Sequence, residues 1–417
     1  MKMCASTDRV SRWEDIDFRA VEQNVKKLQR RIATAFRNDE LGKAASLQEK
    51  LVHSFSAKAL AVKTVTSNRG KHTAGIDGIV WETPEQKIEA LYSLRRRGYQ
   101  PRPAKRVYIR KPGGGVRPLS IPTMRDRAMQ TLYKFALEPI AEVIADSCSF
   151  GFRRSRSARN AVRKLTDILS KDVDNAWTLK ADIQACFDSI SHDWLIVHIP
   201  MDKKMLSKFL ACGYVDRNGF FQTIRGVPQG GCLSSVICNM TLDGLETILR
   251  DSCGCEASMV RYADDIVVVS DSLPILVQSV LPILGGFLQK RGLRLSQEKT
   301  QLIQIERGLT FLGYKIYKRD GTLRSVPSER SEAALLKKIG SISSVLQNTS
   351  LDSLSYSSLK YLYDWFRWTI RGWSNYFSGI ADPSSLLRIQ QEAAETAVNA
   401  SGDERIAGTV LRLFQNY

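Results

Sequence analysis

Apolar residues in positions 14–66 recur at helical spacing. Five of them follow alternating steps of three and four, which places them on one helical face: Phe18, Val21, Val25, Leu28 and Ile32. Asn38-Asp39 interrupts the pattern, and a second helix is predicted after it, through Leu47, Leu51, Phe55 and Leu60. Two packed helices with solvated basic faces explain this region, and a positioned contact with RNA is the alternative.

The middle of the chain alternates short β-forming runs with turns. Residues 107–110 and 116–121 flank Lys-Pro-Gly-Gly-Gly, which predicts a hairpin with a flexible tip. Residues 177–183 predict a strand that delivers Asp182 near its end. Asp320-Gly321 is a strong hairpin turn.

A further hairpin is predicted around two adjacent acids, Asp264 and Asp265. Met259-Val260 precede them and residues 266–269 follow, and both flanking runs are rich in β-forming apolar residues. The acids are therefore expected at the tip of a hairpin whose arms are buried.

Helical patterns return between these strands and at the C-terminus. Helices are predicted at about 157–170, 233–250 and 276–291, and the pattern is helical from about residue 326 to the end. Four residues of the last region share one helical face and are predicted core positions: Phe366, Ile370, Trp373 and Phe377. Arg367 and Arg371 fall elsewhere on that helix, where they could contact backbone phosphates.

The composition adds a strong positive charge to this pattern. The 417 residues include 61 Lys and Arg against 43 Asp and Glu, a net charge of +18. Such an excess is typical of a protein that binds a polyanion, nucleic acid first. A basic membrane-surface protein is the alternative, but the sequence has no Lys-rich amphipathic helix with a clean apolar face.

The expected cellular compartment is inferred from the absence of membrane and secretion signals in the sequence. It has no run of 18 apolar residues and no apolar signal core near its start, which predicts an intracellular protein. The eight cysteines are scattered without a C-x-x-C pair, which favours reduced thiols.

Asp264 and Asp265 are the first candidates for chemistry. Two carboxylates at a turn between buried arms are costly unless a cation meets them. Mg²⁺ binds carboxylate oxygens and leaves other positions to water and phosphate. A plain acidic turn is the alternative. Asp182 is a candidate third carboxylate, which only the fold could bring close.

Basic residues crowd between Arg95 and Arg127, where Asp126 is the only acid after Gln100. Lys111 and Arg117 are expected near one another across the predicted hairpin. Two cations on a mobile hairpin suit a triphosphate, and a solvated basic hairpin is the alternative.

Together these motifs resemble the reverse transcriptases encoded by group II introns. The matching segments follow the family's order across residues 20–380: Gly75-Ile-Asp-Gly78, residues 111–127, Ser149-Phe-Gly-Phe-Arg153, Lys180-Ala-Asp-Ile-Gln-Ala-Cys-Phe-Asp188, Val227-Pro-Gln-Gly-Gly231, Tyr262-Ala-Asp-Asp265, Leu295-Ser-Gln-Glu-Lys-Thr300, Phe311-Leu-Gly-Tyr314 and Arg371-Gly-Trp-Ser-Asn-Tyr376.

The resemblance implies an RNA-dependent DNA polymerase that binds two Mg²⁺ ions, for which Mn²⁺ could substitute. The implied catalytic carboxylates are Asp182, Asp264 and Asp265, and the implied metal ligands are these three and Ile183. The residues implied at the incoming nucleotide are Lys105, Lys111 and Arg117 on the triphosphate, Phe187 as the gate against a 2′-hydroxyl, and Gln229. The residues expected on nucleic acid are Arg125, Arg153, Arg156, Arg367 and Arg371.

The implied fold is an α+β right hand with fingers, a palm with an antiparallel sheet, and a helical thumb. The expected domains are an N-terminal helical extension (1–70), fingers (71–175), palm (176–325) and a thumb similar to maturase domain X (326–417). The expected partners are an RNA template, a DNA primer, dNTPs and the chain's own intron RNA, with no membrane. The expected location is a bacterial cytoplasm, with the nucleoid or a ribonucleoprotein.

Departures from the family leave the biological use open. Arg154-Ser155 and Arg159-Asn160 replace common Pro-Gly and His-Asp pairs in the template track, which bears on specificity. The last His is His198 and the last Cys is Cys255, so no H-N-H nuclease is expected.

An intron-encoded protein that assists splicing and a free-standing enzyme of DNA repair or phage defence both fit. A non-catalytic maturase that only binds RNA is the alternative from another functional class, and the presence of all three acids argues against it. A retron-type enzyme fits the motifs less well.

Overall fold

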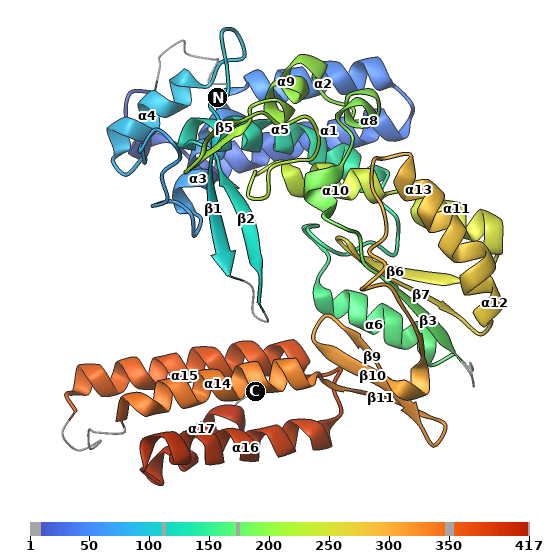
Figure 1. Cartoon of the computed structure of the whole chain (residues 1–417). Coiled ribbons are helices and arrows are strands. Elements are labelled where there is room, and N and C mark those ends of the chain that lie inside the picture. The colour runs from blue at the N-terminus through green and yellow to red at the C-terminus, as the bar shows by residue number, and fades with distance from the viewer. Residues whose placement is uncertain (1–9, 111–113, 172–175, 347–353, 416–417) are drawn as a thin grey trace, which may run out of the picture. The chain divides into compact units, whose positions relative to one another are not determined.

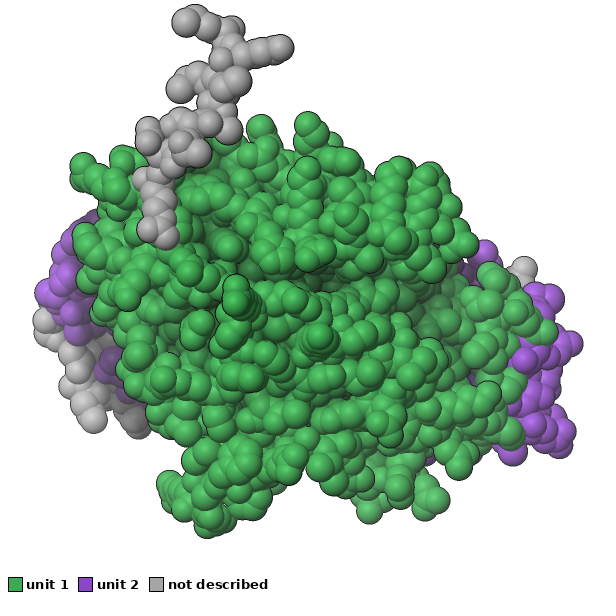
Figure 2. Space-filling model, turned by 90° about the horizontal axis from the view of Figure 1, so that it is seen from above, with its two compact units in different colours: residues 1–153, 182–251, 281–298 green, residues 154–181, 252–280, 299–417 purple. Residues whose placement is uncertain are grey.

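The computed structural model describes residues 10–110, 114–171, 176–346 and 354–415 (Figure 1). The chain forms two compact units, each assembled from three stretches of sequence (Figure 2). Unit 1 consists of Met1–Arg153, Asp182–Asp251 and Leu281–Glu298. Unit 2 consists of Arg154–Ala181, Ser252–Val280 and Lys299–Tyr417. The bounds of the four domains expected above remain predictions.

Unit 1 begins with helices that pack on one long, largely buried helix, α5 (Met124–Val143). The helices in contact with it are α1 (Phe18–Arg37), α2 (Leu41–His53) and α3 (Phe55–Ser67). The predicted first helix is confirmed, with Val21, Val25 and Ile32 buried. The predicted second helix is wrong as a single element. Ser54 ends α2 and caps α3 by accepting a hydrogen bond from the Ala57 N–H, so the chain changes direction there.

The sheet of unit 1 has the strand order β2-β1-β4-β5. Its strands are β1 (Ala104–Arg110), β2 (Val116–Ile121), β4 (Tyr214–Asp216) and β5 (Gly219–Phe221). The predicted 107–121 hairpin is confirmed as β1 and β2, paired antiparallel with Ile109 opposite Arg117. Strand β4 runs parallel to β1, a pairing the local pattern does not reveal.

The remaining helices of this part of the chain are short. They are η1 (Trp13–Asp15), α4 (Pro84–Ser93), α7 (Cys186–Ser189), α8 (His192–His198), α9 (Lys203–Leu210), α10 (Ser234–Leu242), α11 (Leu245–Cys253) and α13 (Leu281–Gln289). The helix predicted at 233–250 is therefore two helices, broken at Asp243-Gly244, where Gly244 has a φ of 90°.

Unit 2 contains a four-stranded antiparallel sheet in the order β6-β7-β3-β8. Its strands are β3 (Trp177–Ala181), β6 (Ser258–Tyr262), β7 (Asp265–Ser270) and β8 (Gln301–Gln304). Helix α6 (Ala158–Leu169) packs against β6. The predicted hairpin arms are confirmed as buried strands, because Val260 and residues 266–269 are almost fully inaccessible.

A second sheet of unit 2 has three antiparallel strands: β9 (Leu309–Phe311), β10 (Tyr314–Arg319) and β11 (Thr322–Pro327). The Asp320-Gly321 turn between β10 and β11 is confirmed. Both residues have positive φ, 52° and 71°, as a two-residue turn that matches strand twist requires. Short helical turns of the unit are α12 (Leu273–Ile275), η2 (Leu276–Val280) and η3 (Ile305–Arg307). The helix predicted at 276–291 thus has a π-helical turn, η2, ahead of α13.

The C-terminal part of unit 2 is helical, as predicted. Its elements are α14 (Glu329–Ser343), η4 (Ser344–Leu346), α15 (Tyr356–Phe377), α16 (Pro383–Ser401) and α17 (Arg405–Gln415). Phe366 and Ile370 of α15 belong to a buried apolar cluster, against which Trp373 packs partly buried, and Phe377 is buried as well. The predicted core face is therefore confirmed. Among the helices of the described ranges, none is long and apolar enough to cross a membrane.

Candidate active site and nucleic-acid interface

Asp264 lies in the tight turn between β6 and β7. Tyr262 pairs with Asp265, which leaves Ala263 and Asp264 as the two turn residues. Ala263 has a φ of 56°, a conformation that costs energy for a residue with a Cβ atom and that is often found at functional sites. Both acids are half-buried beside the buried β7. The predicted presentation of two carboxylates at a hairpin tip is confirmed.

A third acid, Asp182, directly follows the neighbouring strand, β3. Ala181, the last residue of β3, pairs with Ile266. Asp182 follows Ala181 in the chain and Asp265 precedes Ile266, so the acids are attached to the same end of two adjacent strands. The segment after β3 is held by backbone hydrogen bonds: Ser296 N–H donates to the Asp182 carbonyl (2.8 Å), and Ile183 bridges to Leu295.

The donor chemistry of these acids suits a hard cation, since carboxylate oxygens are the ligands that Mg²⁺ takes in proteins. Within the ranges that the structure describes, no group of three or more His, Cys, Asp or Glu side chains is gathered as a formed metal site. The roles of Asp182, Ile183, Asp264 and Asp265 as metal ligands therefore stay predictions.

A glycine-bearing loop, residues 225–231, packs against the segment that carries Phe187. The Val227 N–H donates to the Phe187 carbonyl (2.6 Å) and the Gly226 N–H to the Ile190 carbonyl (2.7 Å). Gly226 has a φ of 80°, and a Cβ atom there would lie 2.6 Å from the backbone of Asp188. The loop can approach this closely only because position 226 is glycine.

Gln229 connects this loop to two other elements. Its side-chain Nε2 donates to Asp188 Oδ2 (2.9 Å), and its carbonyl accepts from the Ser120 N–H of β2 (2.7 Å). Burial raises the pKa of Asp188, while the charge of Arg106 and the hydrogen bond from Gln229 act in the opposite direction. Sequence reasoning missed Asp188, although its place in Lys180–Asp188 was a usable signal.

Two of the three cations expected on the triphosphate, Lys105 and Arg117, lie on strands β1 and β2. Lys105 and Arg117 are exposed, and the strand register places both on the same face of the hairpin, since Ile109 is opposite Arg117. Lys111 lies outside the described residues. The expected roles of these three residues stay predictions.

Three of the five arginines expected on nucleic acid are exposed: Arg125, Arg367 and Arg371. Arg156 is half-buried. Arg159, part of a departure from the family pattern, donates hydrogen bonds to the carbonyls of Asn375 (2.9 Å) and Ser378 (2.6 Å), so it anchors the end of α15. Asn160 completes a capping box with Ser157 at the start of α6, a local pattern that the sequence does contain.

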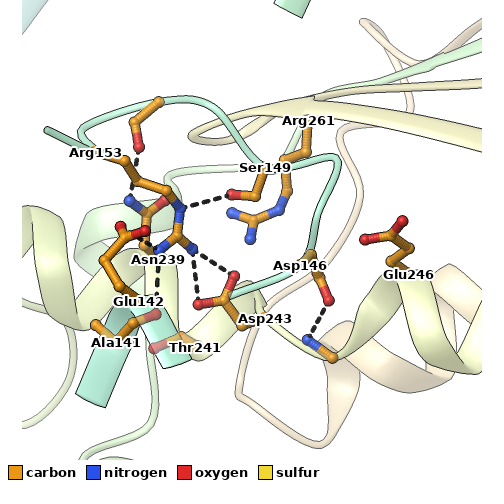
Figure 3. A network of polar contacts seen from close by, with 12 residues as sticks. Ala141, Glu142, Asp146, Ser149, Arg153, Asn239, Thr241, Asp243, Glu246 and Arg261 are labelled. Atoms are coloured by element: carbon orange, nitrogen blue, oxygen red, sulfur yellow. Dashed lines mark hydrogen bonds and ion pairs between the residues drawn. The ribbon is translucent and has the colours of Figure 1, made fainter. Parts of the chain in front are cut away.

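The burial and hydrogen bonds of Arg153 argue against the prediction that this residue contacts nucleic acid. Its side chain is 2% exposed and donates to both carboxylate oxygens of Asp243, at 2.7 and 2.8 Å (Figure 3). It also donates to Ser149, Glu142 and the Ala141 carbonyl. A guanidinium enclosed in this way is not accessible to a phosphate, so Arg153 supports the structure of unit 1.

Comparison with known proteins gives two matches to family models. The model of "Reverse transcriptase (RNA-dependent DNA polymerase)" matches residues 109–316. The model of the "N-terminal domain of reverse transcriptase" matches residues 13–94. Together they cover residues 13–94 and 109–316, which include the three candidate acids and the 225–231 loop, whereas Lys105 and most of β1 lie between the two matched ranges.

Two of the similar proteins come from bacteria. Protein YkfC of Escherichia coli (strain K12) is 28% identical over 359 residues, which are 74% of this chain and 93% of YkfC. Group II intron-encoded protein LtrA of Lactococcus lactis subsp. cremoris is 36% identical over 197 residues, 45% of this chain and 32% of LtrA. The match thus spans about a third of the length of LtrA.

Among solved structures, the telomerase of Candida albicans in complex with a TWJ fragment of telomeric RNA is similar with a TM-score of 0.43 and 15% identity. The similarity covers 76% of this chain and 62% of the telomerase chain. At this level it carries no argument about the present chain.

Proposed function

The chain belongs to the reverse transcriptase family, and we propose that it is an RNA-directed DNA polymerase of the group II intron-encoded kind. In this proposal it extends a primer 3′-hydroxyl with dNTPs on an RNA template. The observation that carries the proposal is the pairing of Ala181 with Ile266, which attaches Asp182 and Asp265 to adjacent strand ends. Three acids from two distant segments have no evident use in a protein that only binds RNA.

The acids supply the centre of the proposed mechanism. Asp182, Asp264 and Asp265, with the backbone of Ile183, would hold Mg²⁺, whose chemistry is activation of the primer hydroxyl and neutralisation of the leaving pyrophosphate. The main task of the protein in phosphoryl transfer is positioning and charge neutralisation. The tight β6–β7 turn supports this task, because its short connection restricts where Asp264 can move.

The remaining residues bind and select the incoming nucleotide. Lys105, Lys111 and Arg117 would neutralise the triphosphate, and the sequence from 104 to 121 that contains them has no acid. Phe187 would lie beneath the sugar and exclude a 2′-hydroxyl. The backbone bond from Val227 to Phe187 supports this role, because it restrains the segment that carries the ring.

The nucleic acid would follow the basic surface. The proposed phosphate contacts are Arg125, Arg156, Arg367 and Arg371. The net charge of +18 on the chain favours the binding of a polyanion. Phosphate contacts of this kind orient a duplex without reading its sequence.

The test is extension of a DNA primer annealed to an RNA template, with dNTPs and Mg²⁺, by wild type and by Asp264→Ala. DNA product from wild type and none from the variant is the expected result. Absence of product from wild type, with RNA binding intact, would instead indicate an RNA-binding splicing cofactor.

We further propose that the protein binds the RNA of its own intron and assists splicing, which the similarity to an intron-encoded protein supports. The test is splicing of a precursor that contains the intron flanking the gene, with and without the protein. A gene without a flanking intron would favour the free-standing role in repair or phage defence.

A further inference from the structure

Unit 1 contains a large cavity that the proposed polymerase mechanism does not use. It has a volume of about 710 Å³ and is lined by residues of α1, α2, α5, the end of α8 and the segment 200–202 (Figure 1). All of its lining residues differ from those proposed to bind metal, nucleotide or nucleic acid. We call it the α2–α5 cavity. Its volume is typical of small-molecule sites.

The wall of the α2–α5 cavity is largely apolar and is braced by hydrogen bonds. Ala136 and Ile140 of α5 and Met201 are buried residues that line it. Gln48 of α2 joins two of its sides, because its side-chain Nε2 donates to the carbonyls of Ala136 and Pro200, both at 3.0 Å. An apolar wall that is held in place in this way favours a ligand with an apolar body.

The charged residues of the cavity have a negative balance. Glu49 and Asp202 line it together with a single cation, Arg96, a formal balance of −1. Arg96 Nε donates to Asp202 Oδ2, so the cation is already paired with an acid of the same wall. This balance is opposite in sign to that of the chain, whose net charge is +18. The cavity therefore favours a ligand with a positive charge.

Two histidines that line the cavity add hydrogen-bond acceptors. His53 Nδ1 donates to the Glu49 carbonyl (2.9 Å), and His198 Nδ1 donates to the Trp194 carbonyl (2.8 Å). Because a carbonyl only accepts, Nδ1 carries the proton, and in the neutral ring Nε2 is left as an acceptor.

A metal ion and an organic cation are the two positive ligands to compare. Within the described ranges, no three His, Cys, Asp or Glu side chains are gathered as a metal site. A protonated amine needs no such convergence, and it offers a positive charge to Glu49 and N–H donors to an acceptor. The rings of Phe36 and Tyr133, which also line the cavity, attract cations by their faces.

We propose that the α2–α5 cavity binds a small organic cation, a molecule with an apolar ring body and a protonated amine. The ring body would pack against the buried apolar residues of α5, and the amine would be neutralised by Glu49. This inference is independent of the proposed polymerase function, because it uses none of the residues proposed for it.

The experiment titrates the full chain with three indoles that share a ring and differ in charge at neutral pH: tryptamine (cation), indole-3-ethanol (neutral) and indole-3-acetate (anion). Binding is measured by calorimetry and by ligand-observed NMR. Tryptamine should bind with a Kd below about 1 mM and at least about threefold more tightly than indole-3-ethanol, and indole-3-acetate should bind most weakly. The net charge of +18 alone would produce the opposite order, because it attracts an anion.

Two pairs of variants locate the site. Ala45→Trp, at an exposed position of α2 that lines the cavity, should weaken tryptamine binding at least about tenfold by filling the space. Its control, Ala20→Trp at an exposed position of α1 outside the lining, should bind as wild type does. Glu49→Gln should bring tryptamine within about twofold of indole-3-ethanol, whereas the control Glu256→Gln should keep the preference.

Several results would overturn the proposal. They are tightest binding of indole-3-acetate, no binding of tryptamine up to about 10 mM, or unchanged tryptamine binding by Ala45→Trp. If Ala45→Trp does not fold, Glu49→Arg tests the same location by placing a positive charge at an exposed position of the wall, and unchanged tryptamine binding there would also overturn the proposal. Primer extension is not a readout here, so failure of the polymerase proposal and failure of this inference are distinguishable.

Discussion

Arg153 and Asp243 form an ion pair in which both side chains are only 2% exposed, with two N–O distances of 2.7 and 2.8 Å. The pair joins the segment after α5 to the break between α10 and α11, 90 residues later in the chain. Both charges lose their water on folding, so each depends on the other for compensation. The pair therefore explains an arginine that the basic sequence around it had assigned to nucleic acid.

Removing one partner should destabilise the protein strongly. Arg153→Ala leaves the Asp243 carboxylate buried without its main counter-charge, which costs about 3–5 kcal/mol and should lower the melting temperature by about 10 °C. Asp243→Asn should show a loss in the same direction. Arg30→Ala, at an exposed position of α1, should change stability by less than about 0.5 kcal/mol. If Arg153→Ala melts like wild type but binds RNA more weakly, the original assignment to nucleic acid is restored.

A methyl group at Gly226 should disturb the 225–231 loop. The added Cβ atom would lie 2.6 Å from the backbone of Asp188, and the φ of 80° disfavours any residue other than glycine. Gly226→Ala should therefore lower kcat/KM for primer extension at least about tenfold, because misplacement near a reacting centre is costly. Gly285→Ala in α13, where nothing lies within 4 Å of the new atom, is the control and should leave activity unchanged. Equal activity of both variants would contradict the close packing of the loop.

Glu246 should make stability depend on acid pH. Burial alone would raise its pKa, but hydrogen bonds from Ser147 (2.6 Å) and the Cys148 N–H (3.2 Å) outweigh burial and lower the pKa. A lowered pKa means that the stabilisation is present above the unfolded value of about 4.3 and is lost as pH falls through the folded value.

The matching measurement compares melting temperatures of wild type and Glu246→Gln between pH 7 and pH 3. At pH 7 the variant should be less stable by about 1 kcal/mol, the typical worth of such hydrogen bonds. The difference should narrow below about pH 4. Glu256→Gln, at an exposed position, should show no such trend. A difference that stays constant across this range would contradict the assignment.

Local patterns in the sequence predicted the elements that carry the candidate chemistry. The acids at 264–265 could be placed at a hairpin tip because β-forming residues flank them on both sides, and Asp320-Gly321 could be placed at a turn because both residues tolerate positive φ. The order of motifs then predicted the family, although no single motif was specific.

Features that depend on distant partners were not predictable in this way. The burial of Arg153 depends on Asp243, and the orientation of Gln229 depends on Asp188, 41 residues earlier in the chain. Neither partner is distinguishable by local spacing from a solvated acid. The break at Ser54 was missed for a different reason: a single capping serine inside an apolar helical pattern is easily overlooked.

The most direct test of the central claim concerns Asp182, because it reaches the proposed metal site from a different segment than Asp264 and Asp265. Single-nucleotide incorporation on an RNA template with Mg²⁺ would be measured for wild type, Asp182→Asn and Asp271→Asn. The last is a matched control at an exposed acid that directly follows β7. The account predicts at least about a hundredfold loss of rate for Asp182→Asn and wild-type rates for Asp271→Asn. Wild-type incorporation by a folded Asp182→Asn would contradict the claim that the strand ends of β3 and β7 build one catalytic site.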